Sequence, residues 1–251
     1  MTTPFDCRKL NLTRDPLDPR DHGERMAFLR PPRLPSSMSY AHPTLVGPVV
    51  DQGETGSCVG QALASLCYFL FRLRTPNQAF SARWIWMAAK EIDQWMPSVM
   101  FDGAGTRARD ALKVLNKYGA CPELLWPFDE PLPWVYRETE IIRTAAQHRI
   151  GEYWRLSGLG AQRNHLATVG PFPIGVPVYE NWSEIGSDGV VPMPHGALLG
   201  GHELLATGYD DATALVEAKN SWGPEHGSLG YVYLPYAYVE EHAWDAWGTC
   251  A

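Results

Sequence analysis

The chain has 251 residues, enough to bury roughly 70 to 75 % of the surface that its unfolded form exposes, so it can fold as one large domain or two small ones without metals or disulfides. Its content of 45 % hydrophobic and 20 % charged residues excludes disordered, collagen-like and coiled-coil proteins. A formal net charge of -7 argues against nucleic acid as a partner, because nucleic-acid binding requires a surface that neutralises phosphates.

The chain shows no stretch of about 18 apolar residues and no apolar stretch of signal-peptide length near its start. We therefore expect no membrane partner and a cytoplasmic location, or export by a route without a leader. The five cysteines include no C-x-x-C pair, and the histidines show no metal-ligand spacing. This pattern predicts neither a disulfide framework nor a metal site, and we expect no cofactor.

The first segment, residues 1–49, carries 8 of the 21 prolines of the chain. Each proline removes a backbone donor and biases the preceding residue toward extended geometry, so a long helix is excluded here. We expect a strap that lies on a folded domain.

Three helices are predicted after the strap. Apolar residues at alternating three- and four-residue spacing indicate helices over residues 58–74, 81–95 and 106–118. Thr75-Pro76 ends the first, Pro97 stops the second, and Gly119 is suited to cap the third.

Beyond about residue 150 the pattern changes from helical to strand-like. Short segments rich in Val, Leu and Tyr, bounded by Gly, Asp or Pro, predict strands over residues 201–209, 214–220 and 230–239. A helical first half and a β-rich second half indicate two packed subdomains with a cleft between them.

Cys58 lies at the start of the first predicted helix, directly after a glycine-rich turn. The unpaired N–H groups and the positive end of the helix dipole favour a thiolate there. A free thiol is only a few per cent ionised at neutral pH, with a pKa of about 8.5, so a nucleophilic cysteine also needs a histidine beside it.

His202 is the histidine that fits this role. If residues 210–212 form a three-residue loop, Asn220 lies directly opposite His202 in the hairpin, so the amide oxygen can hold one ring nitrogen and leave the other for the thiol. A register shifted by two residues is the alternative.

Together these residues resemble the papain-like cysteine peptidases. The resemblance is carried by Gln-Gly-x-x-Gly-Ser-Cys58 at a helix start, by Gly-Gly-His202, and by Asn220-Ser-Trp-Gly in the same order along the chain. It covers roughly residues 48–236 and is closest to the bacterial or viral branch without a long propeptide. His226 stands where a second tryptophan often follows in the family, and we interpret it as a surface or packing residue.

The resemblance implies an α+β papain-like fold. Residues 1–49 would be the strap, with residues 34–49 packed on the β subdomain. Residues 50–140 would form the helical subdomain that carries the nucleophile, and residues 141–251 the β-rich, barrel-like subdomain that carries His202 and Asn220, with the active-site cleft between the two.

It also implies a function, the cysteine-dependent hydrolysis of peptide bonds in a peptide or protein. Cys58 and His202 would form a thiolate–imidazolium pair oriented by Asn220, and the reaction would pass through a thioester. Gln52 would donate to the oxyanion together with the backbone N–H of Cys58.

The remaining site residues follow from the same resemblance. Trp222 would shield the hydrogen bond between Asn220 and His202 from water. Gly105, Thr106 and Gly201 would contact the substrate.

Three alternatives remain open at this point. The same residues would serve another acyl-transfer enzyme, such as an amidase or a transpeptidase, and a non-catalytic binding protein could use the same scaffold. The strap is either scaffold or an inhibitor that lies through the cleft. If it inhibits, deletion of residues 1–33 should raise the activity.

Overall fold

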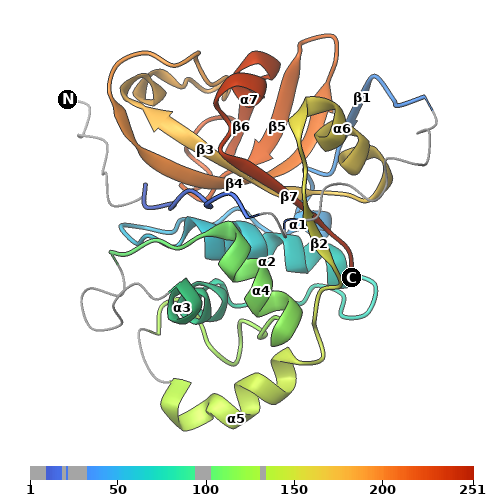
Figure 1. Cartoon of the computed structure of the whole chain (residues 1–251), viewed down its shortest axis with the longest axis vertical. Helices are drawn as coiled ribbons and strands as arrows, with labels where there is room; N and C mark the ends of the chain where they lie inside the picture. The colour runs from blue at the N-terminus through green and yellow to red at the C-terminus, as the bar shows by residue number, and fades with distance from the viewer. Residues whose placement is uncertain (1–9, 19–20, 22–32, 94–102, 131–133) are drawn as a thin grey trace.

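The computed structural model describes residues 10–18, 21, 33–93, 103–130 and 134–251. Figure 1 shows a layer of helices below a sheet of strands, with residues 10–18 in dark blue between the two layers. The predicted mixture of a helical first half and a β-rich second half is confirmed.

The helical layer consists of α2 (Cys58–Phe71), α3 (Ala82–Asp93), α4 (Ala108–Lys117) and α5 (Trp134–Ala145). The first three lie where the apolar spacing predicts them, apart from a few residues at their ends. The predicted end of the second helix, near residue 95, lies outside the described residues. α2 ends at Phe71, because the carbonyl of that residue accepts the N–H groups of Arg74 and Thr75 in a closing turn. α5 runs past residue 140, the expected boundary of the helical part.

α2 is the central helix of this layer. It packs on α3 and α4 and also on strand β4 (Leu198–Asp210) of the sheet. Its apolar residues Val59, Leu63 and Leu66 are fully buried in the core between the layers. This packing holds the first residue of α2, Cys58, against the sheet.

The sheet is antiparallel and follows the order β2-β7-β3-β4-β5-β6, with β1 attached to the outer part of β4. Besides β4, its strands are β1 (Ser37–Ser39), β2 (Tyr153–Arg155), β3 (Phe172–Tyr179), β5 (Leu215–Lys219), β6 (Tyr231–Pro235) and β7 (Asp245–Thr249). β3 and β4 lie at its centre, so their side chains are buried on both faces.

Two expectations for the second half are wrong. The segment 230–239 is not one strand: it is β6 followed by α7 (Tyr236–His242), which begins after Pro235 and buries Tyr238 and Val239. The region after residue 150 is not strand-like throughout either, because α6 (Gly158–Thr168) buries Leu159 and Leu166 beside the sheet.

The β4–β5 hairpin has a different register from the predicted one. Its loop spans the four residues 211–214 rather than three, with Ala214 at a positive φ of 55°, and a bulge near Gly208 adds a further residue on β4. The last pair is Leu205 with Lys219, so Asn220 follows on toward Leu204 and not toward His202.

The later part of the strap lies on the sheet. β1 pairs with the outer half of β4, and α1 (Pro43–Val46) leads to α2. The Tyr40 hydroxyl donates to the carbonyl of Leu166 at 3.2 Å, and the Tyr209 hydroxyl donates to the carbonyl of Pro35 at 2.7 Å. Residues 34–49 are therefore fastened to β4 and α6.

No helix among the described residues is long and apolar enough to span a bilayer, and the cytoplasmic location stays a prediction. The four described cysteines, Cys58, Cys67, Cys121 and Cys250, are all free thiols. Cys7 lies outside the described residues.

Candidate active site

Cys58 lies at the N-terminus of α2, where that helix meets β4. The side chain is fully buried, and the backbone N–H of Glu203, the residue after His202, hydrogen-bonds to its sulfur. Burial raises the pKa of the Cys58 thiol to about 12 and outweighs this hydrogen bond. Burial thus opposes the thiolate that the helix terminus favours.

His202 and Asn220 contact each other directly. His202 Nε2 lies 2.7 Å from Asn220 Oδ1, although the two residues are not opposite each other in the hairpin. The observed register instead makes them diagonal neighbours on one face of the sheet, because His202 and Leu204 share that face. A diagonal pair is within reach of a ring and an amide side chain.

The neighbours of Asn220 fix the orientation of its amide group. The Ser221 N–H donates to Asn220 Oδ1 at 2.7 Å, and Asn220 Nδ2 donates to His226 Nδ1 at 3.2 Å. Because Oδ1 is thus the oxygen, His202 must carry its proton on Nε2 and donate it to Asn220. In the neutral ring, Nδ1 of His202 is then a proton acceptor.

Trp222 covers this hydrogen bond with its indole ring. The ring stacks on the His202 imidazole, with centroids 4.4 Å apart and planes inclined by 29°. It also forms T-shaped ring contacts with Trp182 and with His226. The buried indole keeps water from competing for the hydrogen bond between His202 and Asn220.

Gln52 is held next to the residue that follows Asn220. Its backbone N–H donates to the Ser221 carbonyl at 2.9 Å, and its Oε1 accepts the Ser221 hydroxyl at 2.5 Å. Its amide nitrogen, which carries two hydrogens, donates one to the Thr55 carbonyl at 2.8 Å. The loop before Cys58 and the segment after β5 are thereby fastened together.

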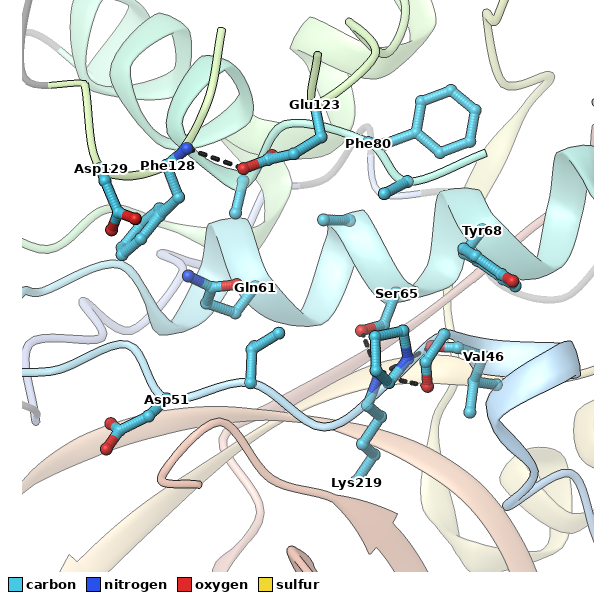
Figure 2. A pocket seen from close by; sticks show the side chains of 16 residues that line it. Val46, Asp51, Gln61, Ser65, Tyr68, Phe80, Glu123, Phe128, Asp129 and Lys219 are labelled. Carbon is cyan, nitrogen blue, oxygen red and sulfur yellow. Dashed lines mark hydrogen bonds between the residues drawn. The ribbon is translucent and has the colours of Figure 1, made fainter. Parts of the chain in front are cut away.

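Lys219 ties the strand that leads to Asn220 to the helix that carries Cys58. Figure 2 shows the side chain of Lys219 reaching Val46, the last residue of α1, and Ser65 of α2. Its Nζ donates to the carbonyls of Val46 and Gly47 at 2.7 and 3.1 Å and to the Ser65 hydroxyl at 2.9 Å. Burial lowers the pKa of this lysine to about 7. The adjoining cavity of about 280 Å³ contains none of the predicted catalytic residues among its lining residues.

The early part of the strap runs along the same cleft. Asn11 forms a parallel bridge with Gly201, and the Leu12 N–H donates to the Gly201 carbonyl at 3.1 Å. On the facing wall, the Thr13 N–H donates to the Thr106 carbonyl at 3.2 Å. A Cβ built on Gly105 would lie 1.4 Å from the Asn11 carbonyl oxygen, so this close approach requires glycine.

The predicted substrate contacts are thus all strap contacts in this structure. Gly105, Thr106 and Gly201 each touch residues 11–13 of the strap. Because the strap backbone occupies both walls, no peptide can lie on these residues at the same time.

Acidic residues fasten the next part of the strap to α4. Arg109 Nη2 donates to Asp21 at 2.7 Å and to the Pro16 carbonyl at 2.5 Å, and its backbone N–H donates to Asp15 at 3.2 Å. Arg155 Nε of β2 lies 3.5 Å from Asp21. Arg109 of α4 and Arg155 of β2 therefore hold the part of the strap that follows residues 11–13.

The sequence reasoning missed two residues of the site. His226, expected to be a packing or surface residue, hydrogen-bonds to Asn220, and Lys219 anchors the strand before it. A lysine within a short apolar strand is a signal for Lys219, since buried lysines need partners. Among the described residues, no group of three or more histidine, cysteine or acidic side chains could hold a metal ion.

Comparison with known proteins gives consistent results. The family model for papain family cysteine proteases matches residues 34–242. An uncharacterized peptidase C1-like protein of Acanthamoeba polyphaga mimivirus is 28 % identical over 214 residues, which cover 79 % of this chain and 68 % of the relative. Cathepsin B-like CP3 of Giardia intestinalis is 29 % identical over 222 residues, with the same coverage.

Among solved structures, xylellain, a cysteine protease from Xylella fastidiosa, superposes with a TM-score of 0.80 and 29 % identity over 96 % of both chains. These bacterial and viral similarities agree with the branch that the sequence predicts. Together with the family match over most of the chain, they show that the protein is a hydrolase that belongs to the papain family of cysteine proteases.

Proposed function

We propose that this protease cleaves peptide bonds with Cys58 as nucleophile, His202 as acid and base, and Asn220 as the group that orients the imidazole. The observation that carries the proposal is the 2.7 Å contact between His202 Nε2 and Asn220 Oδ1. With Nε2 bound to Asn220, Nδ1 is the proton acceptor of the His202 ring. The ring belongs to the segment that contacts the nucleophile, because the backbone N–H of the next residue, Glu203, hydrogen-bonds to the Cys58 sulfur.

The reaction begins when Nδ1 of His202 takes the proton from the Cys58 thiol. The thiolate attacks the carbonyl carbon of the peptide bond and pushes the electron pair onto the oxygen. The second amide hydrogen of Gln52 and the backbone N–H of Cys58 stabilise this oxyanion. The imidazolium then gives its proton to the leaving amine, and a thioester remains.

Hydrolysis of the thioester completes the cycle. His202 takes a proton from a water molecule, and the hydroxide attacks the thioester carbon through a second oxyanion. The thiolate leaves and recovers a proton from His202, which releases the carboxylic acid and restores the enzyme. If an amine attacked instead of water, the same steps would give acyl transfer, so assays with and without added amine distinguish the two reactions.

We further propose that the strap holds the enzyme in an inactive form. The support is that residues 11–13 use Gly201, Thr106 and the space above Gly105, where a substrate peptide would lie. The high pKa of the buried Cys58 thiol agrees with an inactive state, since only the thiolate is nucleophilic. Displacement of the strap would expose both the cleft and the thiol.

The test is mass-spectrometric mapping of thiol labelling by a peptidyl epoxide at neutral pH. In protein that lacks residues 1–33, we expect selective labelling of Cys58 over the exposed Cys250, and loss of this selectivity when His202→Ala is added. The buried Cys67 of the same helix serves as an internal control for unfolding. Equal labelling rates for Cys58 and Cys250, with or without His202, would contradict the proposed catalytic pair.

A further inference from the structure

His226 lies beside the proposed catalytic residues, in the tight loop that follows Trp222. The loop fixes its backbone, because the His226 N–H donates to the Gly223 carbonyl at 3.3 Å and the Gly230 N–H donates to the His226 carbonyl at 3.0 Å. Its ring forms a T-shaped contact with the Trp222 indole, with centroids 4.8 Å apart. Because His226 is only half-buried, solvent can still exchange protons with this fixed ring.

The Asn220 amide has three neighbours, two of which fix its orientation. Oδ1 accepts the Ser221 N–H at 2.7 Å and lies 2.7 Å from His202 Nε2, while Nδ2 donates to His226 Nδ1 at 3.2 Å. Turning the amide by 180° would exchange its acceptor and its donor. Asn220 is 2 % exposed, so water has little access to replace a lost partner. The Ser221 N–H and neutral His226 together keep Oδ1 directed at His202.

Protonation of His226 conflicts with this arrangement. A protonated imidazole carries hydrogens on both nitrogens, so its Nδ1 becomes a donor and faces the hydrogens of Asn220 Nδ2. If the amide stays in place, the hydrogen bond to His226 is lost. If the amide turns, its Nδ2 faces the Ser221 N–H instead. With His226 protonated, neither orientation of the amide satisfies all of its neighbours.

The turned amide also selects the wrong form of His202. Asn220 Nδ2 would donate to His202 Nε2, so the neutral ring would carry its proton on Nδ1. Nδ1 is the nitrogen that takes the thiol proton of Cys58 in the proposed reaction. In addition, both rings bind to the same amide group, so a positive charge on His226 disfavours the His202 imidazolium that forms during the reaction.

We propose that His226 is a positioning residue that orients the Asn220 amide when it is neutral and disturbs that orientation when it takes up a proton. This inference rests on the proposed function of His202 and Asn220. Histidine is the side chain whose charge ordinarily changes between about pH 5 and 8. The protease therefore has an acidic limit built into this loop: kcat falls as the pH drops through the titration of His226.

Other titratable groups lie on the elements that pack around this loop. They are Glu225 in the loop, Asp51 and His202 beside Trp222, Asp188 in the turn that contacts Ser228, Tyr231, which bridges to Ser228, and Lys219 before Asn220. Burial lowers the pKa of Lys219 to about 7, within the same range, but its side chain is directed at the helical layer. A substitution of His226 leaves all of these groups and the strap in place, so a comparison of variants at each pH isolates the contribution of His226.

The first experiment follows the ring nitrogens of His202 by ¹⁵N NMR in the full-length chain and needs no substrate. The matched variant is His226→Asn, whose side-chain oxygen stands at the position of Nδ1 and accepts a hydrogen bond at every pH. In the wild type, the share of His202 with its proton on Nε2 should fall as His226 takes up its proton. In His226→Asn this step should be absent, which leaves the titration of His202 itself. Identical His202 titrations in the two proteins would overturn the proposal.

The second experiment measures kcat and KM for a peptide amide between about pH 5 and 8 with the full-length protein. The kcat of the wild type divided by that of His226→Asn should fall about 2- to 10-fold toward the acidic end, because one hydrogen bond is lost. There the wild-type kcat should approach that of His226→Phe, which has no acceptor at any pH, while the KM values of the three proteins agree. A ratio that does not change with pH would overturn the role of His226 and leave the peptidase function standing. Failure to cleave any peptide would contradict the proposed function, while the NMR titration would still decide the role of His226.

Discussion

Shortening Leu12 to alanine should open the closed form. Leu12 is 5 % exposed and is packed in the core cluster that also contains Cys58. Removing a buried leucine side chain beyond Cβ costs about 2 to 3 kcal/mol when the site cannot collapse around the gap. This cost falls on the closed form alone, because Leu12 is solvated once the strap leaves the cleft.

Since about 1.4 kcal/mol corresponds to a tenfold change in an equilibrium constant, the ratio of open to closed protein should rise about 30- to 150-fold. The assay is the alkylation rate of Cys58 in the full-length chain, followed by mass spectrometry, together with the initial rate of peptide cleavage. Both rates should rise by the same factor as long as the open form is the minor species.

The matched control is Leu17→Ala, which removes the same atoms from the same strap. Leu17 is 92 % exposed, so its truncation should leave both rates unchanged. Equal effects of Leu12→Ala and Leu17→Ala would refute the reasoning that burial of Leu12 holds the strap in the cleft. A lower cleavage rate in Leu12→Ala would refute it as well.

Three further predictions concern the site and its pH dependence. Gln52→Ala should lower kcat about 100- to 1000-fold, yet leave alkylation of Cys58 by iodoacetamide unchanged, because alkylation forms no oxyanion. His226→Phe removes the acceptor for Asn220 Nδ2 and should lower kcat about 2- to 10-fold at constant KM, as measured by steady-state kinetics. Burial raises the pKa of Asp15 to about 6 and that of Asp245 to about 7, so the closed form binds more protons than the open form. Closure is therefore strongest below the ordinary aspartate pKa of 3.8 and weakens as the pH rises from 3.8 through about 6, the pKa of Asp15 in the closed form. The Cys58 alkylation rate of the wild type, divided by that of Asp15→Asn, should rise over this range and then level off.

The helices of the fold could be predicted because their signal is local. The three- and four-residue spacing of Leu63, Leu66 and their neighbours is a property of one segment, and α2 buries those residues. α7 was missed because Tyr236–His242 is as rich in aromatic and branched residues as a strand, and only its packing against α6 and the sheet makes it a helix. β3, which contains Pro173 and Pro177, could not be identified from its residues, because its pairing with β4 depends on residues far along the chain.

The contact between His202 and Asn220 could be predicted, although the strand register that produces it differs from the expected one. The expected register placed the residues directly opposite one another, whereas the four-residue loop and the bulge shift the strands. Near Asn220 the observed register differs from the expected one by two residues, because Asn220 continues toward Leu204 instead of His202. Side chains alternate between the two faces of a sheet, so a shift of two residues keeps His202 and Asn220 on the same face. The strap could not be placed from sequence, because its position depends on glycines at 105 and 201 that only the folded cleft brings together.

In the proposed closed form, inhibition is joined to the chemistry of the nucleophile. Removing water from around Cys58 raises the pKa of its thiol to about 12, so a closed molecule has its cleft filled and its nucleophile protonated at the same time. A thiol is also a poor target for oxidants, which react with the thiolate. Opening would reverse both effects together, because solvent reaches the sulfur through the same space that the substrate uses. Burial of Leu12 would therefore set how readily the closed form opens.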